Sequence, residues 1–222
     1  MAAEKNKLRA LLFSLVLGFG IVGGLFAQDD FLPDSAKLAI AEGNEAFADG
    51  KYKQARNAYR MVIQVSPNHL PALVNLGLTE FYLGNHADAE KLLKQAVQQR
   101  IETAPAWLIL GLIYLDQNKL DAALAALTQA TYHDPKNARA HNFLGVVVGR
   151  LGWLEAAEAE LRKAIELDEK YADANYNLAL FYLDRKSPAI ELARRHYRRA
   201  LELGAEKDPE VEKMLSNSEP SR

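Results

Sequence analysis

The residue types that carry most metal and enzyme chemistry are either missing from this 222-residue sequence or scattered along it. There is no cysteine, which excludes disulfides, thiolate nucleophiles and cysteine-bound metals. The five histidines form no HExxH pair or other ligand spacing, and no Walker, GxGxxG or GxSxG motif occurs. We therefore expect no enzymatic activity, no metal and no cofactor, and we assign the histidines structural or surface roles.

The densest group of charges predicts a solvated helix face. The stretch ARRHYRRALE places four arginines within residues 194–199, and Glu191 and Glu202 lie at helical spacing from them. This pairing favours an exposed convex face over an anion-binding site. The formal net charge of the chain is −2, so no basic excess indicates nucleic acid as a partner.

The N-terminus has the pattern of an export signal. A basic start, MAAEKNKLR, precedes 18 uncharged residues, Ala10–Ala27, and a polar run begins abruptly at Gln28. Cleavage there would remove a signal peptide, residues 1–27, and leave residues 28–35 as a linker. The apolar run is also just long enough to act as an uncleaved membrane anchor. In both cases we expect an exported protein, periplasmic or secreted if cleaved, and membrane-anchored by residues 10–27 if not.

A period of 34 residues accounts for the apolar stretch WLILGLIYL at residues 107–115. Small residues recur at this step in two series: Gly43, Gly77, Gly111, Gly145 and Ala179, then Ala55, Ala89, Ala123 and Ala157. A fixed period in this range is typical of a solenoid. We interpret the small residues as places where two helices approach closely, because glycine inside a helix otherwise costs about 1 kcal/mol. The turns between the helices are predicted at Gly50, Gly84, Asn118 and Gly152.

The sequence resembles the tetratricopeptide repeat (TPR) family, whose unit is a helix–turn–helix of 34 residues. The third unit, AWLILGLIYLDQNKLDAALAALTQATYHDP, has the family's tryptophan, glycine, tyrosine, alanines and proline in place. The resemblance implies an all-α fold: a right-handed superhelical solenoid of about five repeats with a short C-terminal capping helix. The repeats are assigned to residues 36–69, 70–103, 104–137, 138–171 and 172–207. Residues 208–222 are assigned to the capping helix, predicted at 210–215, and to a tail.

Two repeats depart from the pattern. The first has Glu42 where the others have leucine, and Ala46 where an aromatic residue is usual. The fifth has two extra residues in its turn, so we expect its second helix to begin at Ser187-Pro188. Its packing residues then fall two positions late, at Ala193, Tyr197 and Ala200.

In the TPR family the first helices of the repeats line a concave face that binds ligands. Most residues at these places are apolar here, exposed apolar area on this scale indicates a partner, and asparagine amides can hold a peptide backbone. Coverage of these positions by superhelix closure or by the capping segment is the alternative. The cation places of the family's carboxylate clamp hold Ile40, Pro105 and Ile109, so that clamp is rejected. Carried over by position, the peptide-binding residues are Asn44, Val74, Asn75, Leu78, Leu108, Ile109, Leu112, Asn142, Phe143, Val146, Tyr176 and Asn177.

The leading hypothesis is an exported protein–protein interaction scaffold that holds a peptide or partner helix of unknown identity in this apolar groove. The alternative is a membrane-anchored subunit or assembly factor of a cell-envelope complex, in pilus, secretion or envelope biogenesis. An enzyme is disfavoured because no nucleophile–base or metal set appears.

Overall fold

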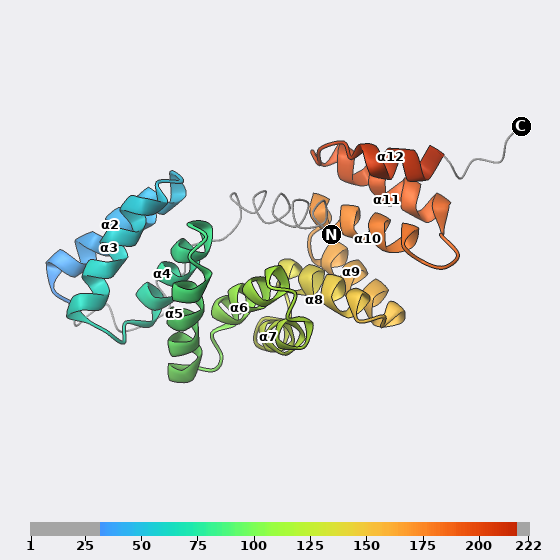
Figure 1. Cartoon of the computed structure of the whole chain (residues 1–222). Helices are drawn as coiled ribbons and strands as arrows, with labels where there is room; N and C mark the ends of the chain where they lie inside the picture. Colours follow the sequence, from blue (N-terminus) through green and yellow to red (C-terminus); the bar gives the residue numbers. More distant parts are fainter. Residues whose placement is uncertain (1–31, 217–222) are drawn as a thin grey trace, which may run out of the picture. The chain divides into compact units, whose positions relative to one another are not determined.

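The structure, a computed structural model, describes residues 32–216, which form eleven α-helices and no strand (Figure 1). The predicted all-α repeat fold is confirmed for this part of the chain. The predicted signal peptide or anchor, half of the linker (residues 28–31) and the tail lie outside the described residues. No helix within residues 32–216 has the length and apolar character needed to cross a membrane.

The chain divides into two compact units, unit 1 up to Lys119 and unit 2 from Leu120 onward. Unit 1 contains two helix pairs and the first helix of a third repeat. α2 packs on α3, α4 packs on α5, each of these second helices packs on the next first helix, and α4 also contacts α6. The helices are α2 (Asp34–Ala48), α3 (Tyr52–Val65), α4 (Leu70–Tyr82), α5 (His86–Gln99) and α6 (Ala104–Asp116).

Unit 2 follows the same pattern. Its helix pairs are α8 with α9 and α10 with α11, α7 packs on α8, α9 packs on α10, and α8 also contacts α10. The last helix, α12, contacts α11. The helices are α7 (Leu120–His133), α8 (Ala138–Arg150), α9 (Leu154–Leu167), α10 (Ala172–Leu183), α11 (Ile190–Glu202) and α12 (Pro209–Ser216).

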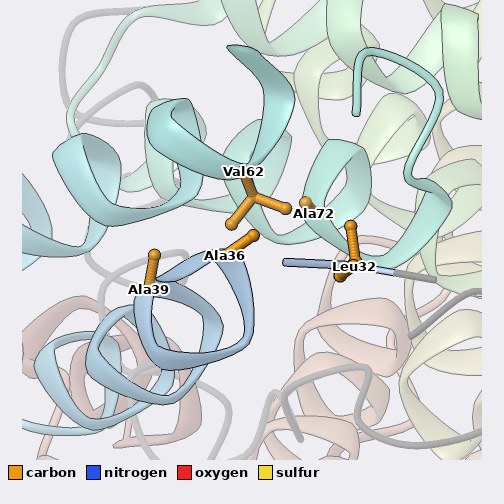
Figure 2. Close-up of a cluster of buried hydrophobic side chains, with 5 residues drawn as sticks. All are labelled: Leu32, Ala36, Ala39, Val62 and Ala72. Carbon is orange, nitrogen blue, oxygen red and sulfur yellow. The ribbon is translucent and has the colours of Figure 1, made fainter. Parts of the chain in front are cut away.

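A cluster of small apolar side chains joins the first repeat to the second. Val62 of α3 points between α2 and α4, toward Ala36 and Ala72, and Ala39 and Leu32 complete the cluster (Figure 2). Their exposed fractions lie between 0% and 7%. A single helix pair has no partner for this face, so the contact between repeats is what buries it.

The glycines of the 34-residue series lie where the two helices of a repeat cross. A Cβ atom at Gly77 would lie 2.7 Å from Leu93 Cγ. At Gly145 it would lie 2.8 Å from Leu161 Cγ and 3.2 Å from the carbonyl oxygen of Ala157. These separations leave no room for a side chain, and they confirm the predicted close approach.

The turns within the repeats fall at the predicted residues. Gly50, Gly84, Asn118 and Gly152 have φ values of 71°, 78°, 57° and 85°. At the end of α8 the Gly152 amide donates to the Gly149 carbonyl, and the Trp153 amide donates to the Val148 carbonyl. This is the Schellman pattern, which satisfies the last carbonyls of a helix and requires a residue that tolerates positive φ.

The fifth repeat differs from the sequence prediction in one respect. The prediction that its second helix begins at Ser187-Pro188 is wrong, because α11 begins at Ile190. The Ala189 amide donates to the Tyr182 carbonyl at 3.0 Å, which keeps residues 184–189 in the turn. The two-residue insertion itself is confirmed, since the late packing positions 193, 197 and 200 are all buried.

The C-terminal helix α12 covers part of the last repeat, as predicted for a capping helix. Val211 and Leu215 are its buried side chains. Asp208 precedes the helix, receives a 2.6 Å hydrogen bond from the Tyr176 hydroxyl and accepts from the Glu210 amide. The Arg194 guanidinium donates to the Leu215 carbonyl, so α11 holds the other end of α12.

Candidate binding surface

In unit 1 the predicted binding residues lie on three first helices. Asn44 is on α2, where its side-chain oxygen accepts a 2.8 Å hydrogen bond from the Tyr59 hydroxyl. Burial raises the pKa of Tyr59, which keeps that hydroxyl protonated as the donor. The other residues are carried by the neighbouring helices α4 and α6: Val74, Asn75, Leu78, Leu108, Ile109 and Leu112.

In unit 2 the predicted residues lie on α8 and α10. The Asn177 amide donates to the Asn142 side-chain oxygen at 2.9 Å, which links the two helices directly. The Asn142 amide in turn donates to the Tyr171 hydroxyl at 3.4 Å. Phe143, Val146 and Tyr176 lie on the same two helices.

Most of these side chains are buried. The expectation that they form exposed apolar surface is wrong for all but two of them, because only Asn44 and Val146 are half-buried. The alternative, coverage by superhelix closure or by the capping segment, stays a prediction, and so does the assignment of these side chains as peptide contacts. The buried ones are Val74, Asn75, Leu78, Leu108, Ile109, Leu112, Asn142, Phe143, Tyr176 and Asn177.

Polar contacts between neighbouring repeats recur at one register, and sequence reasoning missed them. Arg60 of α3 lies 2.8 Å from the Glu80 carboxylate of α4. Glu80 is completely buried and also accepts a 2.7 Å hydrogen bond from the Asn85 amide. In unit 2, Arg162 of α9 donates to the Tyr182 hydroxyl of α10 at 3.1 Å.

The same register recurs between α5 and α6. Glu90 pairs with Lys94 at 2.6 Å and receives a 3.2 Å hydrogen bond from the Tyr114 hydroxyl. The hydrogen bond from Lys94 lowers the pKa of Glu90. We call this contact the inter-repeat lock. Arg60 contacts Glu80 directly and Arg162 contacts Tyr182 directly, in each case on the next first helix. Lys94 reaches Tyr114 through Glu90. The signal of the lock in the sequence is the 34-residue step from Arg60 to Lys94.

Four of the five histidines have polar partners within the fold. His69 precedes α4 and its Nδ1 accepts from the Ala72 amide, and His86 lies 3.3 Å from Asp116. His141 contacts Glu160 at 2.6 Å, and His196 contacts Asn175 at 3.0 Å. Burial lowers the pKa of His196. Among the residues that the structure describes, no group of three or more histidine, aspartate or glutamate side chains is arranged to hold a metal.

The arginines of α11 behave largely as predicted. Glu191 pairs with Arg194 at 2.6 Å, and Glu202 pairs with Arg199 at 3.2 Å. Arg195 and Arg198 carry the remaining positive charges of this stretch, and Arg198 is exposed.

The family model described as the tetratricopeptide repeat protein 21 C-terminal ARM domain matches residues 33–195. The chain belongs to this tetratricopeptide-type repeat family. The match covers both helices of every repeat from α2 into α11. No curated protein matches the sequence.

Several solved structures are similar to this tetratricopeptide-type chain. MamA is 27% identical with a TM-score of 0.61, over 72% of this chain and 93% of MamA. TTC0263, a thermophilic TPR protein of Thermus thermophilus, is 24% identical with a TM-score of 0.65, over 82% and 97% of the two chains. YrrB, described as a TPR protein with an unusual peptide-binding site, is 18% identical with a TM-score of 0.63, over 82% and 92%. The last two similarities concern the fold.

Proposed function

We propose that the protein is an interaction scaffold that binds an extended peptide or a partner helix along its first helices. The tetratricopeptide-type repeat fold supports a protein partner, and a peptide-binding site is attributed to YrrB, which shares the fold. The observation that carries the proposal is the contact between first helices of neighbouring repeats, α4 with α6 and α8 with α10. Such a contact gives each unit a continuous row of first-helix side chains.

Asparagines supply the polar part of this row. The Asn142–Asn177 hydrogen bond fixes two amides side by side on α8 and α10. Asn142 is 0% exposed, so it serves to position Asn177, whose amide carries both a donor and an acceptor for a peptide backbone. The half-buried positions, Asn44 and Val146, are where a ligand would first meet the row.

The test is site-specific photo-crosslinking in the native host. A photoreactive amino acid at Val146 should capture the partner, and the same group at Tyr132 of α7, which is 76% exposed, should not. Mass spectrometry of the product identifies the partner and its contacting segment. Capture at Tyr132 with none at Val146 would contradict binding along the first helices.

Calorimetry with the identified segment then measures the contribution of one side chain. Val146→Ala removes two methylene equivalents from the contact, so the affinity should fall by about five- to tenfold. Val65→Ala is the matched control, because Val65 lies on second helix α3 and is 56% exposed. Its affinity should change by less than about twofold. Circular dichroism establishes that both variants are folded.

We also propose that the protein is exported, on the basic, apolar and polar pattern of its first residues. Cleavage after Ala27 gives a periplasmic or secreted scaffold. Retention of residues 10–27 gives the second candidate, a membrane-anchored subunit or assembly factor of a cell-envelope complex. The intact mass of protein purified from its host separates them. A mass that begins at Gln28 supports the first, and a full-length mass in the membrane fraction supports the second.

A further inference from the structure

Among residues 32–216 no helix precedes α2, so within this part of the chain one face of α2 has no repeat packed against it. In the second repeat, Ala72 packs on Val62 of the preceding repeat, and Glu80 bonds to Arg60 of that repeat. These contacts define the side of a first helix that meets the repeat before it. Leu76 is buried on the same side, since it lies four residues from both Ala72 and Glu80.

The corresponding positions of α2 are chemically different and partly exposed. Leu38, at the place of Ala72, is 60% exposed. Exposed Glu42 takes the place of buried Leu76, Ala46 takes the place of Glu80, and Glu45 and Asp49 are exposed beside them. A depression of about 480 Å³ lies here, lined by Glu42, Glu45, Ala46 and Asp49 of α2, by Lys51, which pairs with Asp49 at 2.7 Å, and by residues of α3 that include exposed Met61. This face therefore carries the carboxylates of Glu42 and Glu45, the Asp49–Lys51 ion pair and exposed apolar side chains. We call the carboxylates of Glu42 and Glu45 the acidic floor.

Helix α11, in the described part of the chain, carries a basic residue that complements these carboxylates. With the two-residue insertion, Arg198 of α11 occupies the register of the basic lock residues Arg60, Lys94 and Arg162. Arg60, Lys94 and Arg162 each contact a residue of the next first helix, directly or through Glu90. Arg198 is exposed, and no partner is recorded for it among residues 32–216.

Helix α12 follows α11 where a further first helix would come. Val211 and Leu215 are the third and seventh residues of α12, and both are buried. Ala174 and Leu178 are the third and seventh residues of α10, the preceding first helix, and are buried too. The described part of the chain ends at Ser216, after eight residues of α12. α12 therefore packs on α11, where a further first helix would follow in the repeat pattern.

We propose that the α2 face of one copy stacks on α11 of a second copy, with Arg198 directed at the acidic floor around Glu42 and Glu45. α12 must move aside for this, because it occupies the same side of α11. Displacing it exposes Val211 and Leu215 and breaks the Arg194–Leu215 hydrogen bond, a cost that the new contact between copies must offset. The contact is heterologous, so copies add head to tail. This inference is independent of the proposed binding along the first helices.

Sedimentation velocity of the protein purified from its host, over a range of concentrations and salt, provides the test. The wild-type chain should associate, more weakly as salt is raised. Arg198→Glu should weaken association about tenfold or more, since it places like charges together. Arg195→Glu makes the same charge change one turn away on α11 and should alter it less than about twofold.

Reversing both charges of the proposed contact is the decisive experiment. Glu42→Arg alone should weaken association as Arg198→Glu does, and the two changes in one chain should restore it, since the pair is then reversed. Removal of residues 208–222 should strengthen association, and Glu42→Arg should reverse that gain. Circular dichroism establishes folding of each variant.

Three results would overturn the proposal. One is a wild-type chain that stays monomeric at every concentration while the shortened chain, still folded, does so too. Another is association that Glu42→Arg and Arg198→Glu leave unchanged. The third is failure of the double exchange to restore what each single exchange removes. In the first case the polar α2 face serves only to keep the terminal repeat soluble.

Discussion

Gly145→Ala is expected to destabilise unit 2 although alanine is the better helix former. Alanine is favoured over glycine inside a helix by about 1 kcal/mol. Against this, the new Cβ atom would lie 2.8 Å from Leu161 Cγ and 3.2 Å from the Ala157 carbonyl oxygen. The carbonyl can move only with α9, and overpacking of this kind costs about 1–3 kcal/mol. The free energy of unfolding should therefore fall by about 0–2 kcal/mol.

The sign of the effect should depend on Leu161. Leu161→Ala alone leaves a cavity and costs about 2–5 kcal/mol. In that background the new Cβ atom at Gly145 enters the vacated space, so Gly145→Ala should become stabilising by up to about 1 kcal/mol. Gly77→Ala is a useful comparison, because the three nearest atoms to its Cβ all belong to the Leu93 side chain. That side chain can rotate, so the loss should be smaller than at Gly145.

Urea unfolding followed by circular dichroism measures each change. Ala159→Gly, at an exposed position of α9, supplies the helix-propensity difference in this same helix pair. The packing explanation fails if Gly145→Ala stabilises the otherwise unchanged chain. It fails equally if the loss is the same with leucine and with alanine at position 161.

Three other changes address the lock, a turn and a buried histidine. Arg60→Ala leaves the buried Glu80 carboxylate without its cation and should lower the free energy of unfolding by about 1.5–3 kcal/mol; an unchanged urea midpoint would contradict this. Gly152→Ala should cost about 1–2 kcal/mol because φ is 85°, and Gly152→Asn should cost less; equal losses would refute the backbone explanation. Burial lowers the pKa of His196, so the unfolded chain binds a proton that the folded chain refuses and stability should fall as the pH drops below about 6.5. His196→Gln should reduce that part of the pH dependence measured by thermal unfolding, and an identical profile would exclude His196 as its source.

The fold could be predicted because every repeat must satisfy the same packing constraint, so the same residue types recur along the sequence. Each helix crossing needs a small residue, so the series of four glycines and Ala179 marks every first helix. Each turn needs positive φ, so Gly50 and Asn118 mark the turn even though their types differ. The start of α11 could not be predicted from Ser187-Pro188, because a backbone hydrogen bond from Ala189 to Tyr182 decides it.

The candidate site was less predictable, for two physical reasons. Residue type and register place Leu108 and Phe143 on the correct helices, but their exposure depends on how closely neighbouring first helices pack. The structure leaves them 2% and 5% exposed. The inter-repeat lock depends on the reach of long side chains, such as Arg60 to Glu80 across two repeats, and no propensity encodes that reach.

Departures from the period carry different meanings inside the repeats and at their ends. Thr128 and Val148 replace the lock residues between α7 and α8, and Val148 is buried, so apolar packing takes over at that joint. At the first repeat Glu42 and exposed Leu38 replace residues that are buried elsewhere. A substitution at an interior repeat still packs against a helix of the neighbouring repeat. Within the described residues, the substituted positions of the first repeat have no preceding second helix to pack against. The terminal departures therefore set what an adjoining molecule must present: a helix with a basic residue at the lock register.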